Sequence, residues 1–414
     1  MNLGHGKFAD VTQQAGVLNF APTQAAVFAD FNLDGWIDLF IGNESFPSAP
    51  YPSEFYINNG DGTFRNVINE VGFPIEGYIK GCAVGDVNND GWPDLYISKM
   101  NAGNMLLLNK GPNADGIPQF RNIGAQAGVT EPRVSFPTWF FDYNNDGWDD
   151  IFVSAYGDGG DELLAAHDFV LNARGQRLNG YPRIYRNNGD LTFTEMSKAM
   201  GLNENVYTMG CNYGDLDADG YLDFYLGTGT PEYSSVVPNK MYRNNAGKTF
   251  EDVTASGGFG QIQKGHGVAF GDLDRDGDED LFEVMGGAFH GDVYEDVLFE
   301  NPIGQDQSWV VLRLHGVQSN RSAIGARVKV SVTTPEGTRS IYRKVSTGGS
   351  FGSSSLQLEV GLGDATKIDT IEITWPTKAQ AKQAFHDIPL RKYVDITEGN
   401  DTPVYPDVTP VQFK

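Results

Sequence analysis

The first 302 residues alternate between short apolar runs and clusters of Asp, Asn and Gly. In residues 27–42, VFADFNLDGWIDLFIG, two apolar runs flank an acidic segment that contains one glycine. Short apolar runs bounded by turn residues are typical of β-strands. A second pair of runs follows around a tight turn, as in FYINNGDGTFRNV at 55–67, where Asn and Gly suit the positive φ of a hairpin. The pattern predicts antiparallel sheets of four short strands.

The acidic segment recurs five times at a nearly constant spacing. The copies, numbered here as loops 1 to 5, begin at Asp30, Asp86, Asp142, Asp215 and Asp272, at intervals of 56, 56, 73 and 57 residues. A repeated unit of this length with four strands indicates a β-propeller blade. The long third interval holds an insertion, in which residues 162–171, ELLAAHDFVL, predict a short amphipathic helix.

Residues 303–400 lack the acidic loop but still alternate like strands, as in WVVLRLHG at 309–316 and IDTIEITWP at 368–376. Two interpretations are open: two further blades, or a separate β module docked on a shorter propeller. Seven units roughly fill 414 residues, which favours an all-β, integrin-α-like propeller of seven blades. Residues 1–302 then carry the five loops, 303–400 complete the propeller, and 401–414 form a tail. The start, GKFADVT at 6–12, matches the end of a repeat and is expected to close the ring.

Each loop places oxygen-bearing side chains at positions 1, 3, 5 and 9, and position 6 is Gly in every copy. Carboxylates this close repel one another unless a cation lies among them. Hard oxygen ligands at this spacing suit Ca²⁺, with position 7 contributing its main-chain carbonyl. An EF-hand is excluded, because position 12 of loop 1 is Ile41 and strands flank the loop. The candidate metal ligands are Asp30, Asn32, Asp34, Trp36, Asp38, Asp86, Asn88, Asp90, Trp92, Asp94, Asp142, Asn144, Asp146, Trp148, Asp150, Asp215, Asp217, Asp219, Tyr221, Asp223, Asp272, Asp274, Asp276, Asp278 and Asp280.

The alternative for these loops is a set of solvated acidic turns, in which Asp serves its usual turn chemistry. Five copies in register favour calcium instead, in a mainly structural role that fixes the first two strands of each blade. The aromatic side chains at position 7 of loops 1 to 4 are expected to pack between blades.

The composition argues against several classes of binding partner. A net charge of −24 argues against nucleic acid and anionic membrane surfaces, because both would be repelled. No apolar run approaches the ~20 residues that span a bilayer. Only Cys82 and Cys211 are present, so we expect two buried core thiols rather than a disulfide framework.

The loops resemble the FG-GAP/VCBS repeats of integrin α-chain propellers. The last hundred residues add SNRSAIGARVKV at 319–330, GLGDA at 361–365 and IEITWP at 371–376, which are similar to the ASPIC/UnbV module. Repeats followed by that module resemble the cartilage acidic protein family and its bacterial relatives. The resemblance implies a calcium-loaded propeller, often secreted and linked to adhesion or matrix, and places the calcium positions on the Asp and Asn residues above.

The chain differs from that family in two respects, since it shows neither a signal peptide nor an EGF-like tail. It is expected to be secreted if a signal peptide has been removed, and cytoplasmic if Met1 is the native start. Some calcium propellers of related architecture resemble biosynthetic enzymes that alkylate an aromatic ring. The resemblance therefore also implies an enzyme as an alternative function.

Candidate functional residues gather at the end of the blades opposite the loops, where the strands before the loops begin. Lys80, Arg133, Tyr207 and His266 are expected at that mouth, which is unexpectedly basic for so acidic a chain. They could hold an anionic ligand or polarise a substrate. The alternative is that the cations neutralise neighbouring Asp and Glu. The match of residues 348–352, GGSFG, to a nucleophile motif is set aside as a turn, because no strand-to-helix turn is predicted there.

The sequence supports two alternative hypotheses for the function. The first is a calcium-stabilised propeller that binds a carbohydrate, a protein or a small molecule on the face opposite its loops. The second is a calcium-dependent cyclase or transferase without organic cofactor, forming carbon–carbon bonds with Lys80, Arg133, Tyr207 and His266 as catalytic residues. The repeats, the acidity and the family resemblance favour the binding protein.

Overall fold

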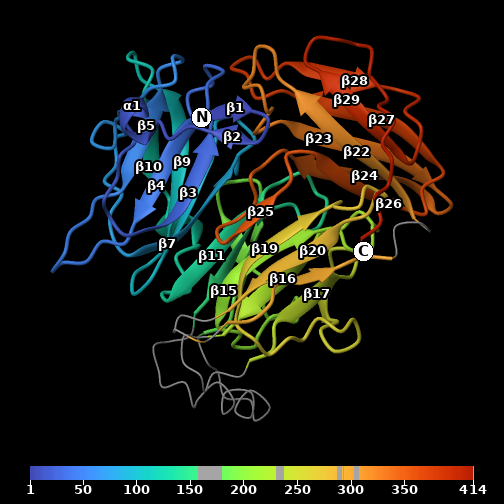
Figure 1. Cartoon of the computed structure of the whole chain (residues 1–414), viewed down its shortest axis with the longest axis horizontal. Helices are drawn as coiled ribbons and strands as arrows, with labels where there is room; N and C mark the ends of the chain where they lie inside the picture. Colours follow the sequence, from blue (N-terminus) through green and yellow to red (C-terminus); the bar gives the residue numbers. More distant parts are fainter. Residues whose placement is uncertain (157–179, 230–236, 287–290, 292, 303–306, 414) are drawn as a thin grey trace.

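The computed structural model describes the whole chain except residues 157–179, 230–236, 287–290, 292, 303–306 and 414 (Figure 1). The fold is all-β. Among the described residues, helix is confined to α1 (Thr12–Ala15) and α2 (Gly124–Ala127). The helix expected at 162–171 lies outside the described residues.

Four consecutive repeats each form one antiparallel sheet of four strands, in sequence order from one edge to the other. We call these sheets blades 1 to 4, and each joins its first two strands through the acidic loop of the same number. The strands are β3 (Thr23–Ala29), β4 (Asp38–Asn43), β5 (Glu54–Asn58) and β6 (Phe64–Asn66) in blade 1; β7 (Ile79–Gly85), β8 (Asp94–Lys99), β9 (Met105–Pro112) and β10 (Pro118–Asn122) in blade 2; β11 (Ser135–Phe141), β12 (Asp150–Ala155), β13 (Arg183–Asn187) and β14 (Phe193–Glu195) in blade 3; and β15 (Thr208–Gly214), β16 (Asp223–Thr228), β17 (Lys240–Asn244) and β18 (Phe250–Asp252) in blade 4.

Blade 5 is completed from a distant part of the chain. Its own strands are β19 (Gly265–Gly271), β20 (Asp280–Met285) and β21 (Val297–Phe299), and β25 (Gly352–Ser354) pairs in parallel with β19. The first strands β3, β7, β11, β15 and β19 lie side by side in that order, so the blades follow an arc from blue to yellow in Figure 1.

Closure of the ring is not confirmed. Among the described strands, no pairing joins blade 5 to blade 1. The start of the chain forms a hairpin of its own, in which β1 (Asn2–Gly4) pairs with β2 (Lys7–Phe8). The expectation that this segment completes a blade with C-terminal strands was therefore wrong for the described residues.

The remaining strands form two sheets that share one core, named here the C-terminal module. One sheet contains β22 (Ser308–His315), β26 (Leu358–Gly363) and β29 (Lys392–Thr397); the other contains β23 (Arg327–Thr334), β24 (Gly337–Lys344), β27 (Lys367–Thr374) and β28 (Lys382–Phe385). Alternate side chains from both sheets, such as Val310 and Val330, are fully buried in this shared core. Strands of the two sheets interleave along the chain, so this arrangement does not confirm two further blades or a count of seven.

A segment between β24 and β26 fills the space enclosed by the first strands. Residues 346–354, named the central segment, include the GGSFG turn and β25 (Figure 1). The Ser350 hydroxyl accepts a hydrogen bond from Cys82 N at 2.8 Å and donates to Cys82 O at 3.0 Å. Gly352 packs so closely on β15 that a Cβ would lie 2.4 Å from Cys211 O. Both cysteines are free and buried, as predicted.

Candidate metal loops and the opposite face

The first carboxylate of each loop organises the loop backbone. In loop 1, Asp30 Oδ1 accepts a hydrogen bond from Asp34 N at 3.0 Å, and Oδ2 accepts one from Gly35 N at 2.8 Å. Glycine is required at position 6, where the backbone takes φ +94°. Asp86 and Asp142 make the equivalent pairs of hydrogen bonds in loops 2 and 3.

The ninth residue joins the loop to the blade. Asp38 Oδ2 accepts a hydrogen bond from Phe31 N at 3.0 Å, and Oδ1 accepts one from Asn58 N on the third strand, also at 3.0 Å. Asp94, Asp223 and Asp280 repeat the arrangement in loops 2, 4 and 5. Each ninth carboxylate is buried at the point where the second strand begins.

Burial makes these acids hard to ionise without a nearby cation. Desolvation raises the pKa of Asp30 to about 7, of Asp38 to about 8 and of Asp142 to about 7, and neighbouring carboxylates add to the rise. A bound cation would oppose both effects, because it replaces lost hydration and offsets the repulsion.

Loops 4 and 5 come closest to a ready set of metal ligands. Position 3 is Asp here, whereas in loops 1 to 3 it is Asn. In each of these two loops, three carboxylate oxygens lie within 4.8 Å of one another, contributed by Asp215, Asp217 and Asp223 in loop 4 and by Asp272, Asp274 and Asp276 in loop 5. Asp217 Oδ1 is buried and accepts no hydrogen bond within the described part of the chain. An all-oxygen donor set with an unsatisfied buried oxygen fits a hard cation.

The aromatic side chains at position 7 do not lie where the sequence predicted. Trp36, 51% exposed, covers the hairpin of its own blade, and a Cβ on Gly60 would lie 3.0 Å from its Nε1. Trp92, Trp148 and Tyr221 cover the equivalent hairpin glycines of blades 2, 3 and 4. These rings therefore pack on the hairpin glycines of their own blades, whereas the sequence predicted packing between blades.

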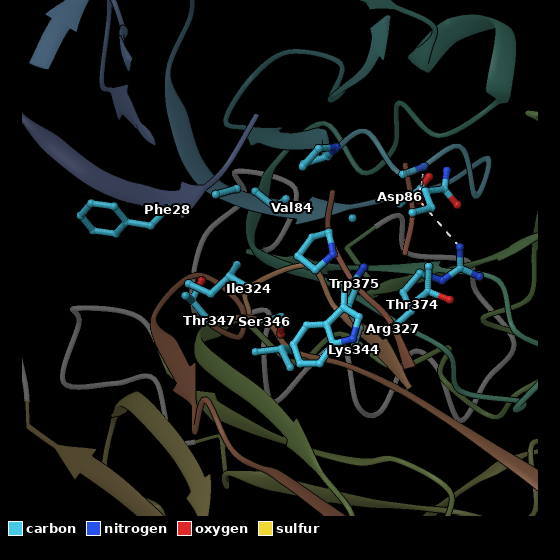
Figure 2. A pocket seen from close by; sticks show the side chains of 18 of the residues that line it. Phe28, Val84, Asp86, Ile324, Arg327, Lys344, Ser346, Thr347, Thr374 and Trp375 are labelled. Carbon is cyan, nitrogen blue, oxygen red and sulfur yellow. Dashed lines mark hydrogen bonds and ion pairs between the residues drawn. The ribbon is translucent and has the colours of Figure 1, made fainter. Parts of the chain in front are cut away.

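The C-terminal module lies over the loops. Its side chains contact loop residues in four blades: Arg327 with Asp86 at 3.8 Å, Lys344 with Asp149, Arg343 with Asp215 at 2.9 Å, and Tyr393 with Asp272. Figure 2 shows the pocket beside the contact between Arg327 and Asp86, which a dashed line joins. In this pocket, Phe28 and Val84 of the blades face Ile324 and Trp375 of the module. Basic groups of the module thus meet the acidic loops directly.

At the opposite end of the blades, Lys80 is buried and already paired. Its ammonium forms an ion pair with Glu44, donates to Gln24 Oε1 at 3.1 Å, and lies 4.5 Å from the ring centre of Tyr78 and 5.1 Å from that of Phe136. The geometry matches the prediction that cations here neutralise neighbouring acids.

The other three predicted catalytic residues have separate surroundings. Arg133 is exposed over 68% of its side chain and pairs with Glu131 at 3.3 Å. Tyr207 is buried with φ 43°, and its carbonyl accepts a hydrogen bond from Gly229 N. His266 is half-buried in β19, with Nδ1 3.3 Å from Lys264 O. A catalytic role for these residues stays a prediction, and their surroundings give the enzyme hypothesis no support.

Sequence reasoning did not foresee that the aromatic rings at this end of the blades pack together into a row. Phe46 and Tyr78 lie 4.3 Å apart between ring centres, and Phe136 stacks on Phe351 at 5.0 Å and on Tyr156 at 5.2 Å. Lys80 lies between the two groups of rings. The sequence places Tyr78 just before β7 and Phe136 near the start of β11 at this face, but Phe351 arrives from the central segment and could not be placed from the repeat.

Comparison with known proteins identifies both parts of the chain. The FG-GAP-like repeat family matches residues 30–97, 142–226 and 227–282, and the ASPIC and UnbV family matches residues 316–403. The chain belongs to the FG-GAP-like repeat proteins with an ASPIC/UnbV module. The first match covers loops 1 to 5, and the second covers most of the C-terminal module.

Curated relatives of this FG-GAP-like protein are similar over part of their length. Cartilage acidic protein 1 of Homo sapiens is 26% identical over 245 residues, which is 58% of this chain and 32% of that protein. The Mus musculus protein is 25% identical over 240 residues, 58% of this chain and 33% of its own. The matched region thus spans about one third of these relatives.

The V. cholerae biofilm matrix protein Bap1 is one solved structure that is similar to this chain. It is 12% identical, with a TM-score of 0.27, over 93% of this chain and 50% of that chain. At that score the likeness adds nothing to the sheet order described above. Among the described residues, no helix is long and apolar enough to cross a membrane.

Proposed function

We propose that this FG-GAP-like repeat protein is a calcium-stabilised, propeller-like binding protein that holds a carbohydrate on the face opposite its loops. The observation that carries the proposal is the aromatic row, in which Tyr78 and Phe136 flank the Lys80 ammonium and contact Phe46 and Phe351. The C-terminal module contacts four of the five loops, which favours the other end of the blades for a polymeric ligand.

Calcium is the cation proposed for the loops. In each loop the carboxylates at positions 1, 5 and 9, the oxygen at position 3 and the main-chain carbonyl at position 7 would hold it. When bound, the ion would neutralise the buried carboxylates and fix the turn between the first two strands. The ligand face would thus be held in shape by ions at the far end of the same strands.

The chemistry of the aromatic row favours a sugar. The apolar faces of sugar rings stack on aromatic side chains, and their hydroxyl groups need donors and acceptors at the rim. Phe46 is 37% exposed, Tyr78 and Phe351 are half-buried, and the Glu44 and Gln24 oxygens lie beside the Lys80 ammonium. Rings that hold one another in place lose little freedom when a ligand stacks on them.

The experiment measures retention of the calcium-loaded full chain on a panel of neutral and acidic polysaccharides. We expect at least one to be bound, and Tyr78→Ala and Phe46→Ala to weaken that binding about tenfold, since a stacking contact contributes on the order of 1 kcal/mol. Phe20→Ala is the matched control, because it removes an aromatic ring that is 87% exposed. Binding to no polysaccharide, or equal loss in all three variants, would overturn the proposal, as would binding only to protein.

A further inference from the structure

Loop 4 is joined to the C-terminal module by a buried ion pair. Arg343 lies near the end of β24, and its Nη2 donates to Asp215 Oδ2 at 2.9 Å. Only 6% of the Arg343 side chain and 2% of the Asp215 side chain are exposed. The same carboxylate oxygen accepts a second hydrogen bond from the module, from Gly361 N at 3.2 Å.

This arrangement differs from the first three loops. There, each oxygen of the first carboxylate accepts a hydrogen bond from a separate backbone amide of its own loop, as in Asp30. In loop 4, Gly220 N reaches both oxygens of Asp215, at 3.3 and 3.1 Å, and the module holds Oδ2 from outside. The module therefore replaces part of the internal framework that orients the first ligand.

The charges of the loops also distinguish loop 4 from the first three loops. Loops 1 to 3 each carry three carboxylates among positions 1, 3, 5 and 9, because position 3 is Asn. Loop 4 carries four, because position 3 is Asp217. The Arg343 guanidinium offsets the additional charge, so the four ligand positions of loop 4 together with Arg343 carry a net charge of −3, the same as the four ligand positions of loop 1.

We propose that Arg343 is a positioning residue for a calcium ion in loop 4, an inference that rests on the proposed function. The guanidinium and Gly361 N hold Asp215 Oδ2 and so fix the orientation of the carboxylate that forms the cluster with Asp217 and Asp223. Outer hydrogen-bond partners of metal ligands commonly change affinity 10- to 100-fold. Affinity at loop 4 thus depends on the seating of the C-terminal module, and by reciprocity the ion strengthens that seating.

The test is a calorimetric calcium titration of the decalcified full chain and its variants. We expect Arg343→Met to weaken one binding site about 10- to 100-fold and leave the others unchanged, and Arg343→Lys to weaken it less. Lys329→Met is the control, since Lys329 pairs with Glu372 inside the module at 3.2 Å. If the wild-type chain binds no calcium, the proposed function fails; if it binds calcium and Arg343→Met alters no site, or tightens one, the positioning role fails.

A second variant separates positioning from charge balance and from general destabilisation. Arg343→Met combined with Asp217→Asn restores the net charge of loop 4 but not the hydrogen bond to Asp215. We expect the weak site to persist in this double variant, and recovery of wild-type affinity would overturn the positioning role. Melting temperatures in chelator report any loss of stability that is independent of calcium, and a loss seen there with unchanged affinities would mean a purely structural arginine.

Discussion

The side-chain amide of Asn109 donates to the main-chain carbonyl of Phe31 at 2.9 Å, across 78 residues of chain. Phe31 is the second residue of loop 1, and Asn109 lies on the third strand of blade 2. The same amide group donates to Pro93 O in loop 2 at 3.0 Å, so one asparagine joins two consecutive loops. Equivalent pairs link the later blades: Asn187 with Val87, Asn244 with Tyr143, and Asn301 with Leu216.

Replacement of this asparagine should destabilise the blades. Asn109→Ala leaves two buried carbonyl groups without their donor, and we expect a loss of about 2–3 kcal/mol in the free energy of unfolding. Chemical denaturation in saturating calcium measures it. Asn59→Ala is the control, because Asn59 bonds Thr63 in an exposed hairpin and should cost less than about 0.5 kcal/mol. Equal losses for the two variants would contradict the role of Asn109 between blades.

Removal of calcium should lower the melting temperature of the whole chain. Each occupied site adds about 2.7 kcal/mol when free calcium exceeds the dissociation constant 100-fold. Thermal unfolding in excess chelator and in excess calcium gives the difference, and magnesium should restore little of it, because it demands a tighter octahedral site. Identical melting temperatures in chelator and calcium would show that the loops are acidic turns only.

Glu283 should make the stability of the calcium-loaded protein depend on pH. Its side chain is buried between blades 4 and 5, where a Cβ on Gly265 would lie 1.8 Å from Oε1, and Tyr225 Oη donates to Oε2 at 2.8 Å. Burial raises the pKa of Glu283 to about 8, above the roughly 4.3 expected when unfolded. The folded state keeps a proton that the unfolded state releases, so the free energy of unfolding falls as pH rises between these values and is level above the higher one.

The measurement is denaturation from pH 5 to 9 in saturating calcium. Glu283→Gln cannot ionise, so it should remove a decrease on the order of a few kcal/mol. The exposed Glu300 supplies the control as Glu300→Gln, which should retain the decrease. A wild-type profile that rises or stays level across this range would refute the assignment.

The central segment should tolerate no added side chain at Gly352. A Cβ there would lie 2.4 Å from Cys211 O and 2.8 Å from Val268 O, both main-chain atoms that cannot move aside. We expect Gly352→Ala to cost about 1–3 kcal/mol through overpacking. Gly267→Ala is the matched control on neighbouring β19, because its Cβ would meet Val284 at 3.6 Å, an ordinary contact. Comparable melting temperatures for the two variants would mean that the segment is loosely held.

The local pattern of the chain was sufficient to predict the five loops and their blades. Loop residues at positions 1, 5, 6 and 9 are close in sequence, so their spacing alone places the Asp30 carboxylate over the amides of Asp34 and Gly35. The prediction that Lys80 neutralises a nearby acid also rested on residues at equivalent strand ends, and Glu44 proved to be that acid. The resemblance to FG-GAP-like repeats and to the ASPIC/UnbV module was confirmed by the matches of both families.

The sequence by itself therefore determined the repeat, the loops and the β character, because each depends on contacts within about 60 residues of one period. Only the tertiary structure decided where residues 308–397 dock, because Arg343 reaches Asp215 and Ser350 reaches Cys82 through contacts with no periodic signal. The two sheets of the C-terminal module bury their facing side chains in one shared core, which the alternation along the chain alone did not specify. The same long-range packing brings Phe351 to Phe136 and so completes the aromatic row, which no spacing along the chain could reveal.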